Sequence, residues 1–427
     1  MLDHKMREYQ IKVVDRDVYT ERIKLFVDMP LVKIITGLRR SGKSCVMRLV
    51  MQEIAIHALA DHIIWINFED LKNQWITSYV QFNEYVLSCI KDDEKYYFFI
   101  DEPQLVYGCE KTVNGLRLKN IDIYVAGSTD KLLDCEFATL LAGRYVSFRV
   151  LPLSFREFIN FRDAFNIRIG DERCELDMYI DVGGFPYLAT VEFNPYVSRN
   201  ILEDINSSIV LKDIIQRTNT NNDPLLKSLL AFVCINIGRH VSIKTIGDFL
   251  KGEKLSVDQN AIVKHIGYLV DACIIYIAPK LDINKKCNTN GEKYYLGEHS
   301  LLYASYGFRE ENKAKILENI VYLELLRRKY TVSTGVLRIT NRNKTGKEKN
   351  VTLEVDFVAE KDRSYVYVQV CNDFRYYSMI KEQKFTPLLE IKNHYRKYVV
   401  TLGNSWQADE NGVKGIPLKD FLLRHEL

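Results

Sequence analysis

The residues best suited to chemistry in this chain form a short glycine-rich stretch from Gly37 to Ser44. Its sequence, Gly-Leu-Arg-Arg-Ser-Gly-Lys-Ser, fits the pattern G-x-x-x-x-G-K-[ST] of a phosphate-binding loop. The two glycines let the backbone turn so that successive N–H groups point at one anion, and a helix that begins there adds its positive end. This stretch therefore predicts a site for a polyphosphate.

Within the loop, Lys43 and Ser44 carry most of the predicted chemistry. Lys43 supplies a point charge for the β- and γ-phosphates, and the Ser44 hydroxyl is a ligand for the Mg²⁺ that bridges them. ATP and Mg²⁺ are the predicted cofactors. The residues expected to bind the nucleotide are Gly37, Leu38, Arg39, Arg40, Ser41, Gly42, Lys43, Ser44 and Cys45.

The residues on either side supply the elements that must position this loop. The apolar run 31–35 predicts a strand, and 45–54 has the apolar spacing of a helix. A surface turn with basic residues is the alternative, but it does not account for this strand, loop and helix order. Residues 16–28 predict a lead-in helix that packs on the same domain.

A second apolar run, 96–100, ends in the carboxylates Asp101 and Glu102. After a P-loop and one intervening strand, this pattern is typical of a Walker B segment. Asp101 is predicted to hold the Mg²⁺, and Glu102 to act as the base that polarises the water attacking the γ-phosphate. A strand that simply ends in a turn is the alternative.

The intervening strand, 63–68, ends in Glu69 and Asp70. Ligands of open α/β sheets collect at the carboxyl ends of strands, so these acids are candidates to order a magnesium-bound water. Asp70 fits a helix N-cap equally well.

Two more side chains complete the predicted catalytic set of Lys43 and Glu102. Ser128 follows a buried strand and is predicted to hydrogen-bond the γ-phosphate or its attacking water, with a plain turn at Gly127 as the alternative. Arg144 precedes an alternating strand and is predicted to neutralise transition-state charge, in its own chain or in an oligomer on a neighbouring subunit. A solvated arginine is the alternative there.

Composition sets broader limits. A chain of 427 residues is expected to form roughly two to four domains. A net charge of +3 gives no overall attraction to nucleic acid or membrane, and the nine cysteines include no C-x-x-C pair. Without a signal-peptide pattern or an apolar run long enough to span a bilayer, the expected location is the cytoplasm, with no membrane partner.

The apolar pattern divides the chain into four predicted parts. They are a P-loop ATPase domain (1–160), a helical lid or connector (161–222), a winged-helix domain (223–308) and a C-terminal domain (309–427). In the third part, three helices followed by two short strands have the outline of a winged helix-turn-helix whose third helix reads DNA. Lysines available for phosphate contacts are Lys251, Lys254, Lys264, Lys280, Lys285 and Lys286. Use of this module for domain packing alone is the alternative.

The last part contains acids in a pattern similar to the restriction-endonuclease-like, PD-(D/E)XK fold. Glu318, Asp356 and Gln369 occupy the positions of its metal-binding acids, but the lysine expected two residues after Gln369 is Cys371. That lysine would orient the nucleophilic water. A degenerate nuclease fold kept for binding is therefore predicted over an active nuclease.

Together these segments resemble a large family of prokaryotic AAA-like ATPases related to archaeal and signalling types. The residues that carry the resemblance are Gly37–Ser44, Asp101-Glu102, Gly127-Ser128, Leu141–Arg144, Pro152–Phe155, Glu318, Glu354–Asp356 and Gln369-Val370. The resemblance implies an α/β fold: a parallel P-loop NTPase sheet flanked by helices, a winged helix, and a restriction-endonuclease-like α/β domain of unknown function. It also implies ATP binding and slow hydrolysis to ADP with switch behaviour. Two departures are Pro103 after Glu102, and Gly297-Glu298-His299 where an aspartate–glycine pair is expected.

The predicted function is that of a Mg²⁺-dependent ATPase acting as a conformational switch on DNA, which it contacts through the winged helix and C-terminal domain. Two alternatives stay open at this point. One is an ATP-dependent signalling switch with a protein partner, and the other is an ATP-gated nuclease.

Overall fold

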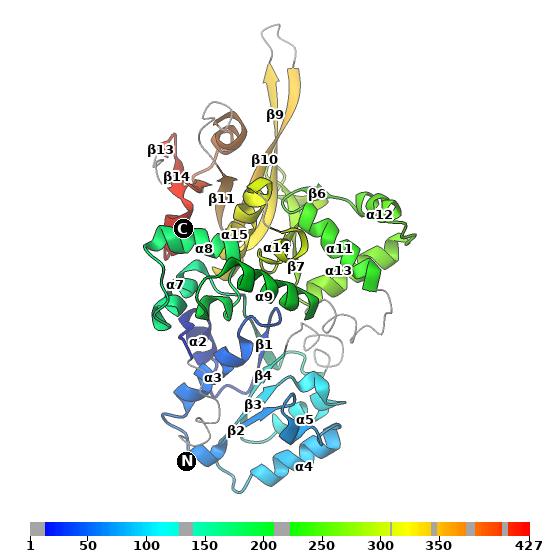
Figure 1. Ribbon diagram of the computed structural model, residues 1–427, viewed down its shortest axis with the longest axis vertical. Helices are drawn as coiled ribbons and strands as arrows, with labels where there is room; N and C mark the ends of the chain where they lie inside the picture. The colour runs from blue at the N-terminus through cyan, green and yellow to red at the C-terminus, as the bar shows by residue number, and fades with distance from the viewer. Residues whose placement is uncertain are drawn as a thin grey trace. The chain divides into compact units, whose positions relative to one another are not determined.

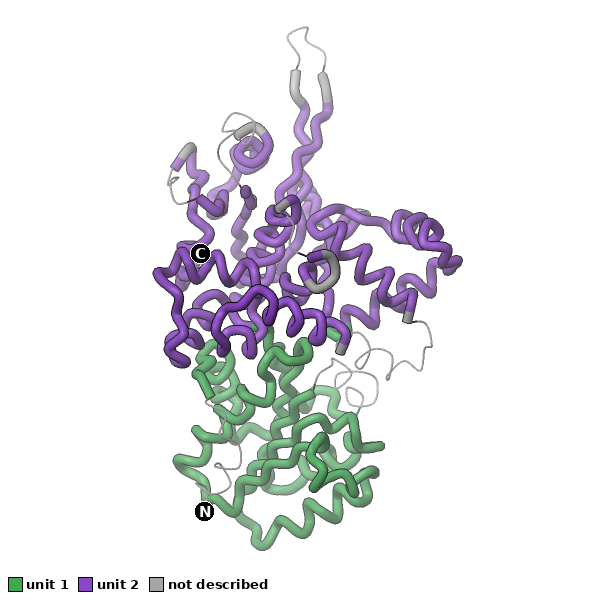
Figure 2. The backbone as a smooth tube through the Cα atoms, viewed as in Figure 1, with its two compact units in different colours: residues 1–152, 271–273 green, residues 153–270, 274–427 purple. Residues whose placement is uncertain are grey.

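The computed structural model describes residues 13–127, 140–208, 223–307, 310–342, 348–372, 381–403 and 409–427. The chain forms two compact units, shown in Figure 2. Unit 1 is Met1–Pro152 with Asp271–Cys273, and unit 2 is Leu153–Val270 with Ile274–Leu427. The finer division into four parts stays a prediction. Among the described residues, no helix is long and apolar enough to cross a membrane.

Unit 1 is built around a five-stranded sheet with the strand order β2-β3-β4-β1-β5. All four pairings are parallel, so the carboxyl ends of the strands lie at one edge. The strands are β1 (Val32–Thr36), β2 (Ile63–Asn67), β3 (Tyr96–Asp101), β4 (Ile121–Ala126) and β5 (Tyr145–Arg149). This confirms the predicted α/β class with a parallel sheet.

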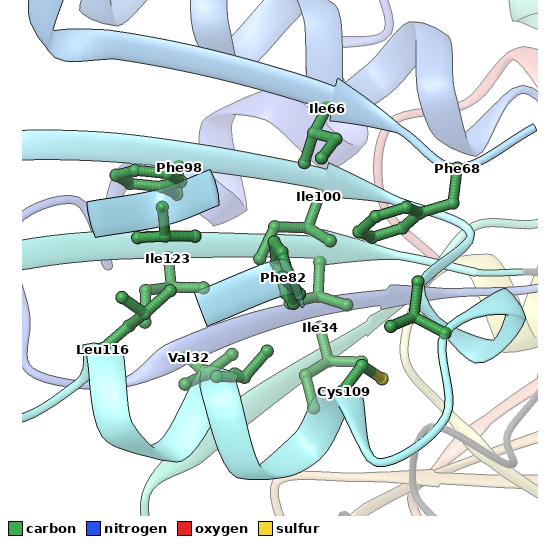
Figure 3. Close-up of a cluster of buried hydrophobic side chains, with 14 of the residues drawn as sticks. Val32, Ile34, Ile66, Phe68, Phe82, Phe98, Ile100, Cys109, Leu116 and Ile123 are labelled. Atoms are coloured by element: carbon green, nitrogen blue, oxygen red, sulfur yellow. The ribbon is translucent and has the colours of Figure 1, made fainter. Parts of the chain in front are cut away.

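Helices cover both faces of this sheet. They are α2 (Asp17–Lys24), α3 (Lys43–Ile54), α4 (Tyr79–Cys89) and α5 (Cys109–Leu116), with short 3-10 turns η1 (Ala60–His62), η2 (Leu71–Asn73) and η3 (Pro103–Leu105). Because successive side chains of a strand point to opposite faces, each strand contributes to two cores. In Figure 3, Val32 and Ile34 pack with Phe98 and Ile123 beside α4 and α5. On the other face Ile35 packs with residues of α2 and α3. Burial on both sides explains why the strands are continuously apolar in sequence.

Unit 2 contains a nine-stranded mixed sheet with the order β13-β14-β12-β11-β10-β9-β7-β8-β6. The strands are β6 (His240–Val241), β7 (Ile275–Asp282), β8 (Cys287–Leu296), β9 (Thr331–Arg342), β10 (Glu348–Lys361), β11 (Ser364–Cys371), β12 (Arg396–Thr401), β13 (Asp409–Glu410) and β14 (Val413–Pro417). Figure 1 shows β9 and β10 as a long antiparallel hairpin, with β11 beside β10.

The helices of unit 2 precede this sheet in the chain or lie between its strands, except for the last, which follows β14. They are α7 (Phe155–Ala164), α8 (Glu172–Val182), η5 (Leu188–Thr190), α9 (Pro195–Ser208), α11 (Asp223–Ile235), α12 (Ile243–Gly252), α13 (Gln259–Asp271), α14 (Leu301–Tyr306), η7 (Glu310–Asn312), α15 (Lys313–Arg327), the π-turn η8 (Lys381–Phe385), α17 (Thr386–Leu389) and α18 (Leu418–Leu423). Ser154 and Glu157 form a capping box that starts α7, and the Ser242 side chain caps α12 by accepting the Thr245 N–H.

The region predicted to be a winged helix has the element order α11, β6, α12, α13, β7 and β8. This is the helix and hairpin outline read from sequence, although the hairpin is longer than the two short strands expected. The hairpin is also not separate from the C-terminal strands, because β7 pairs in parallel with β9 through Lys280↔Thr334 and Asp282↔Val336. Two predicted parts therefore share one sheet, while their assignment as winged helix and nuclease-like fold stays a prediction.

Candidate functional site

The loop between β1 and α3 is the centre of the candidate nucleotide site. Gly37 has φ 142°, and a Cβ there would lie 2.1 Å from the carbonyl oxygen of Val150. Gly42 caps α3 in the left-handed conformation with φ 93°. Close approach of neighbouring backbone therefore requires the first glycine, and the backbone turn favours the second. Helix α3 begins at Lys43, so the positive N-terminal end of this helix points at the loop.

Lys43 is buried and folds back over this loop. Its ammonium group donates hydrogen bonds to the carbonyl oxygens of Gly37 and Leu38, at 3.1 and 3.0 Å. The Leu38 and Ser41 side chains are buried. At these two positions a ligand would therefore meet backbone groups of the loop and not the side chains. A cation and turned backbone thus lie together, as recognition of an anion requires.

Asp101, the last residue of β3, is the acid whose surroundings best suit a magnesium ligand. Ser44 lies close enough to the Asp101 side chain to lower its pKa, and its Oδ1 atom has no hydrogen-bond partner among the described residues. Burial raises the pKa of Asp101 to about 7, with Glu102 adding to the shift and Ser44 and Lys43 opposing it. A buried, unsatisfied carboxylate oxygen beside a serine hydroxyl fits the all-oxygen donor set that Mg²⁺ prefers.

Glu102 follows in a left-handed backbone conformation with φ 53°. A residue other than glycine pays about 1 kcal/mol for this conformation, so the surroundings must hold it. The Glu102 N–H donates to the carbonyl of Ala126 at 2.8 Å, and the Gln104 side-chain amide donates to the Glu102 carboxylate. Burial raises the pKa of Glu102, and Lys43 lowers it. Pro103, a departure from the family pattern, occupies the first turn of η3, where proline is favoured.

The acids after β2 take different positions. Asp70 caps η2, because its carboxylate accepts the Lys72 N–H at 3.0 Å. The N-cap alternative is therefore correct for Asp70. Glu69 is exposed and lies 3.4 Å from the Arg39 guanidinium, so the first loop arginine is paired with an acid at the same edge of the sheet.

The structure does not bring every predicted catalytic residue to this site. Ser128 lies outside the described residues. Arg144 precedes β5, and its carbonyl accepts the Val32 N–H at 3.0 Å at the start of β1. The phosphate loop follows the other end of β1, and a five-residue strand separates these two edges by about 15 Å. Arg144 is thus not placed beside Lys43 and Glu102 of its own chain, which leaves two predictions, that it acts on a neighbouring subunit or that it is a solvated arginine.

One residue that sequence reasoning did not single out touches the loop directly. Arg16 is 1% exposed, and its guanidinium donates to the carbonyls of Ser41 at 2.7 Å and Leu151 at 2.9 Å. An arginine before an amphipathic helix has no spacing that reveals such a role. The signal appears only once the fold is known.

Unit 2 contains a second acidic cluster, formed by the residues predicted from the nuclease-like pattern. Asp356 on β10 accepts the Val370 N–H at 2.8 Å, and its own N–H donates to the Gln369 side chain at 3.2 Å. Glu318 on α15 accepts the Tyr295 hydroxyl at 2.7 Å and interacts electrostatically with Asp356. The structure therefore brings Glu318, Asp356 and Gln369 together as expected.

Two lysines also enter this cluster, and neither follows from the sequence spacing. The Lys384 ammonium, from η8, lies 2.6 Å from Asp356 Oδ2. The Lys293 ammonium, from β8, lies 2.6 Å from Glu354 Oε1 and 3.4 Å from Glu318 Oε1. The cluster therefore contains two ammonium groups, although Cys371 stands where the pattern expects a lysine. Among the described residues, no group of three or more His, Cys, Asp or Glu side chains is arranged to hold a metal ion.

The comparisons with known proteins agree with the geometry of unit 1. Residues 30–159 match the family model described as an AAA domain, and residues 173–312 match a domain of unknown function. The Walker-type ATPase of Pyrococcus abyssi superposes with a TM-score of 0.50 at 15% identity, covering 69% of this chain and 96% of that chain. The AAA match, the phosphate loop and the parallel sheet together show that residues 30–159 are similar to an AAA-like P-loop domain.

Two relatives match most of the chain. An uncharacterized protein of Haemophilus influenzae is 33% identical over 419 residues, covering 96% of this chain and 99% of that protein. An uncharacterized protein of Methanocaldococcus jannaschii is 28% identical over 378 residues, covering 87% and 80%. The chain belongs to the same family as the Haemophilus influenzae protein.

Proposed function

We propose that this protein binds ATP with Mg²⁺ in unit 1, hydrolyses it, and uses the cycle as a conformational switch. The observation that carries the proposal is the meeting of the phosphate loop with Asp101, whose carboxylate is buried beside Ser44. A carboxylate whose pKa lies at about 7 in the protein alone gains most from a cation that arrives with the nucleotide.

Each residue has an assigned role in this proposal. The loop backbone and Lys43 hold the phosphates, and Ser44 and Asp101 hold the Mg²⁺, which supplies charge neutralisation on the β- and γ-phosphates when bound. Glu102 accepts a proton from the attacking water, and the contact with Gln104 orients its carboxylate. Ser128 as a γ-phosphate sensor and Arg144 as a cation supplied to a neighbouring subunit complete the proposed machinery.

ATP binding and turnover by variants of these residues test the proposal. We expect Lys43→Ala to lose ATP binding, and Glu102→Gln to bind ATP while its kcat falls roughly 10²- to 10⁴-fold. The exposed Glu84 on α4 provides a matched control, since Glu84→Gln alters an equivalent side chain away from the loop. Turnover by Glu102→Gln at the wild-type rate would show that the base is another group.

We further propose DNA as the partner of the switch, contacted through unit 2 and its predicted winged helix. The supporting observation is that Lys285 and Lys286 are exposed in the turn of the β7–β8 hairpin, with Lys251 and Lys254 exposed at the end of α12. Each lysine–phosphate contact contributes about −0.9 to the slope of log K against log salt. Binding of duplex DNA should therefore weaken with salt, and Lys285→Glu with Lys286→Glu should reduce that slope. ATP-dependent capture of a protein partner that is insensitive to salt would favour the signalling alternative instead.

A further inference from the structure

We infer that Arg16 is a positioning residue of the phosphate loop, which fixes the peptide plane between Ser41 and Gly42 so that the Gly42 N–H faces the bound phosphate. The inference rests on the proposed nucleotide function of this loop. It adds to that function a residue that lies outside the sequence motif.

Arg16 is itself held in one place. It is the N-cap residue of α2, and its carbonyl accepts the N–H groups of Tyr19 at 2.9 Å and Thr20 at 3.2 Å. Its guanidinium lies over the Tyr19 ring, 4.7 Å from the centroid, and is almost completely buried. A planar guanidinium with a fixed stem presents its donors in one direction, which suits it to orient a neighbouring group.

The contact with Ser41 determines which way the loop backbone faces. In a trans peptide, the carbonyl of one residue and the N–H of the next point in opposite directions. The Ser41 carbonyl points to Arg16 at 2.7 Å, so the Gly42 N–H must point away from Arg16. The Ser41 N–H is already donated to Leu38 O at 3.1 Å. Ser41 thus uses its N–H within the loop, and the next N–H along the chain is that of Gly42, the residue whose orientation Arg16 controls.

A second set of contacts attaches the loop to the chain that leaves β5. Arg16 also donates to Leu151 O at 2.9 Å, and the Leu151 N–H donates to the Tyr19 hydroxyl at 3.1 Å. At the other end of the loop, Val150 N–H donates to Thr36 O at 2.8 Å, beside Gly37. The loop is thus held at both ends before any ligand binds. A binding site ordered in advance loses less conformational entropy on binding, which increases affinity.

The test measures the affinity of folded variants for a non-hydrolysable ATP analogue with Mg²⁺. Hydrogen bonds to charged groups typically contribute enough for roughly a 10- to 100-fold change. We expect Arg16→Ala to raise Kd by that factor, and KM to rise more than kcat falls. Arg16→Lys should fall in between, because one ammonium cannot span both carbonyls. Lys24→Ala removes a cation from the exposed side of α2 and should stay within twofold of wild type.

Tyr19→Phe tests whether Arg16 acts by orienting the Ser41–Gly42 peptide or only by attaching the loop to the segment after β5. It removes the hydroxyl that accepts the Leu151 N–H and leaves the Arg16 contact with Ser41. We expect less than a threefold change in Kd. A loss equal to that of Arg16→Ala would overturn the inference, as would wild-type affinity in folded Arg16→Ala.

If Arg16→Ala does not fold, the Kd of Arg16→Lys tests the inference in its place. Wild-type affinity in Arg16→Lys would then overturn the inference. Failure of the underlying function has a different signature. In that case the wild-type protein and Lys43→Ala would both fail to bind the analogue.

Discussion

The two acidic clusters of this protein differ in how their charge is compensated. In unit 1, Asp101 is buried with one oxygen unpaired among the described residues, and its pKa is raised to about 7. In unit 2, Lys293 and Lys384 lie directly against the carboxylates. Burial lowers the pKa of both lysines, but Glu318 and Asp356 outweigh it and raise the pKa of each. Lys43 thus compensates the burial of Asp101 only in part, whereas the carboxylates of the second cluster lie directly against two ammonium groups.

This difference bears on what each cluster does. Lys43 and Ser44 only partly offset the burial of Asp101, so under the proposed function we expect Mg²⁺ and nucleotide to bind together in unit 1. Carboxylates already paired with ammonium groups gain less from a metal ion, because the lysines must first be displaced. We therefore infer a binding or structural role for the second cluster, while its assignment to a degenerate nuclease fold stays a prediction.

The largest effect should come from breaking the compensated cluster. Lys293 is 2% exposed and lies between Glu318 and Glu354, so Lys293→Met leaves buried negative charge without its partner. Removal of one partner from a buried pair costs about 3–5 kcal/mol. We expect the free energy of unfolding to fall by that amount in denaturant titration. Addition of Glu318→Gln to Lys293→Met should restore part of it.

Lys285→Met is the matched control on the same hairpin, because Lys285 is exposed, and it should change stability little. The contrast between the two clusters would be contradicted if Mg²⁺ alone stabilised the Lys43→Ala protein and Asp356→Asn abolished that stabilisation. Such a result would mean that the second cluster takes up a metal ion despite its lysines.

The uncompensated cluster should appear as a pH dependence of stability. The pKa of Asp101 is raised from 3.8 to about 7 in the folded protein. Between about pH 4 and pH 7 the folded chain keeps a proton that the unfolded chain has released, so this group makes stability fall as pH rises through that window. The contribution is at most about 4 kcal/mol. Thermal unfolding of Asp101→Asn should lack this component of the slope, and Mg²⁺ with a nucleotide should suppress it in wild type.

An exposed acid on the same unit serves as the control for that experiment. Glu84→Gln should keep the wild-type dependence on pH, since Glu84 lies on the outer face of α4. Identical pH profiles for wild type and Asp101→Asn would mean that Asp101 is ionised in the folded protein. In that case its charge would be compensated as in unit 2.

Sequence reasoning succeeded where chemistry depends on neighbours along the chain. The P-loop motif combines a turn, a helix N-terminus and a lysine within a few residues, so spacing alone identifies it. The position of Arg144 could have been judged only from the strand direction as well as the motif. Arg144 precedes β5, whereas Lys43 follows β1. In a parallel sheet, residues before and after the strands lie at opposite edges.

Apart from the local contact of Gln104 with Glu102, the main contacts that sequence reasoning missed join distant segments. Arg16 reaches Ser41 and Leu151, and Lys384 reaches Asp356 from a turn that comes after the strand pair. The parallel pairing of β7 with β9 likewise joins two predicted parts that share no sequence signal. Such contacts depend on strand order and register, which local periodicity does not specify.

The smallest expected effect concerns Gln104 and sharpens the role of Glu102. Burial raises the pKa of Glu102, and the hydrogen bond from Gln104 opposes that rise. Gln104→Ala should therefore raise this pKa further. Because Glu102 must be ionised to accept a proton, the acid limb of the ATPase profile should move to higher pH. We expect activity to fall a few-fold at about pH 6 and to approach wild type above about pH 8, as one pKa unit corresponds to about 1.4 kcal/mol.

Gln74→Ala alters an exposed glutamine after η2 and should leave the pH profile of the ATPase unchanged. An equal loss at every pH would mean instead that Gln104 orients the carboxylate without changing its ionisation, and Glu102→Gln in the same background should then show no additional dependence on pH.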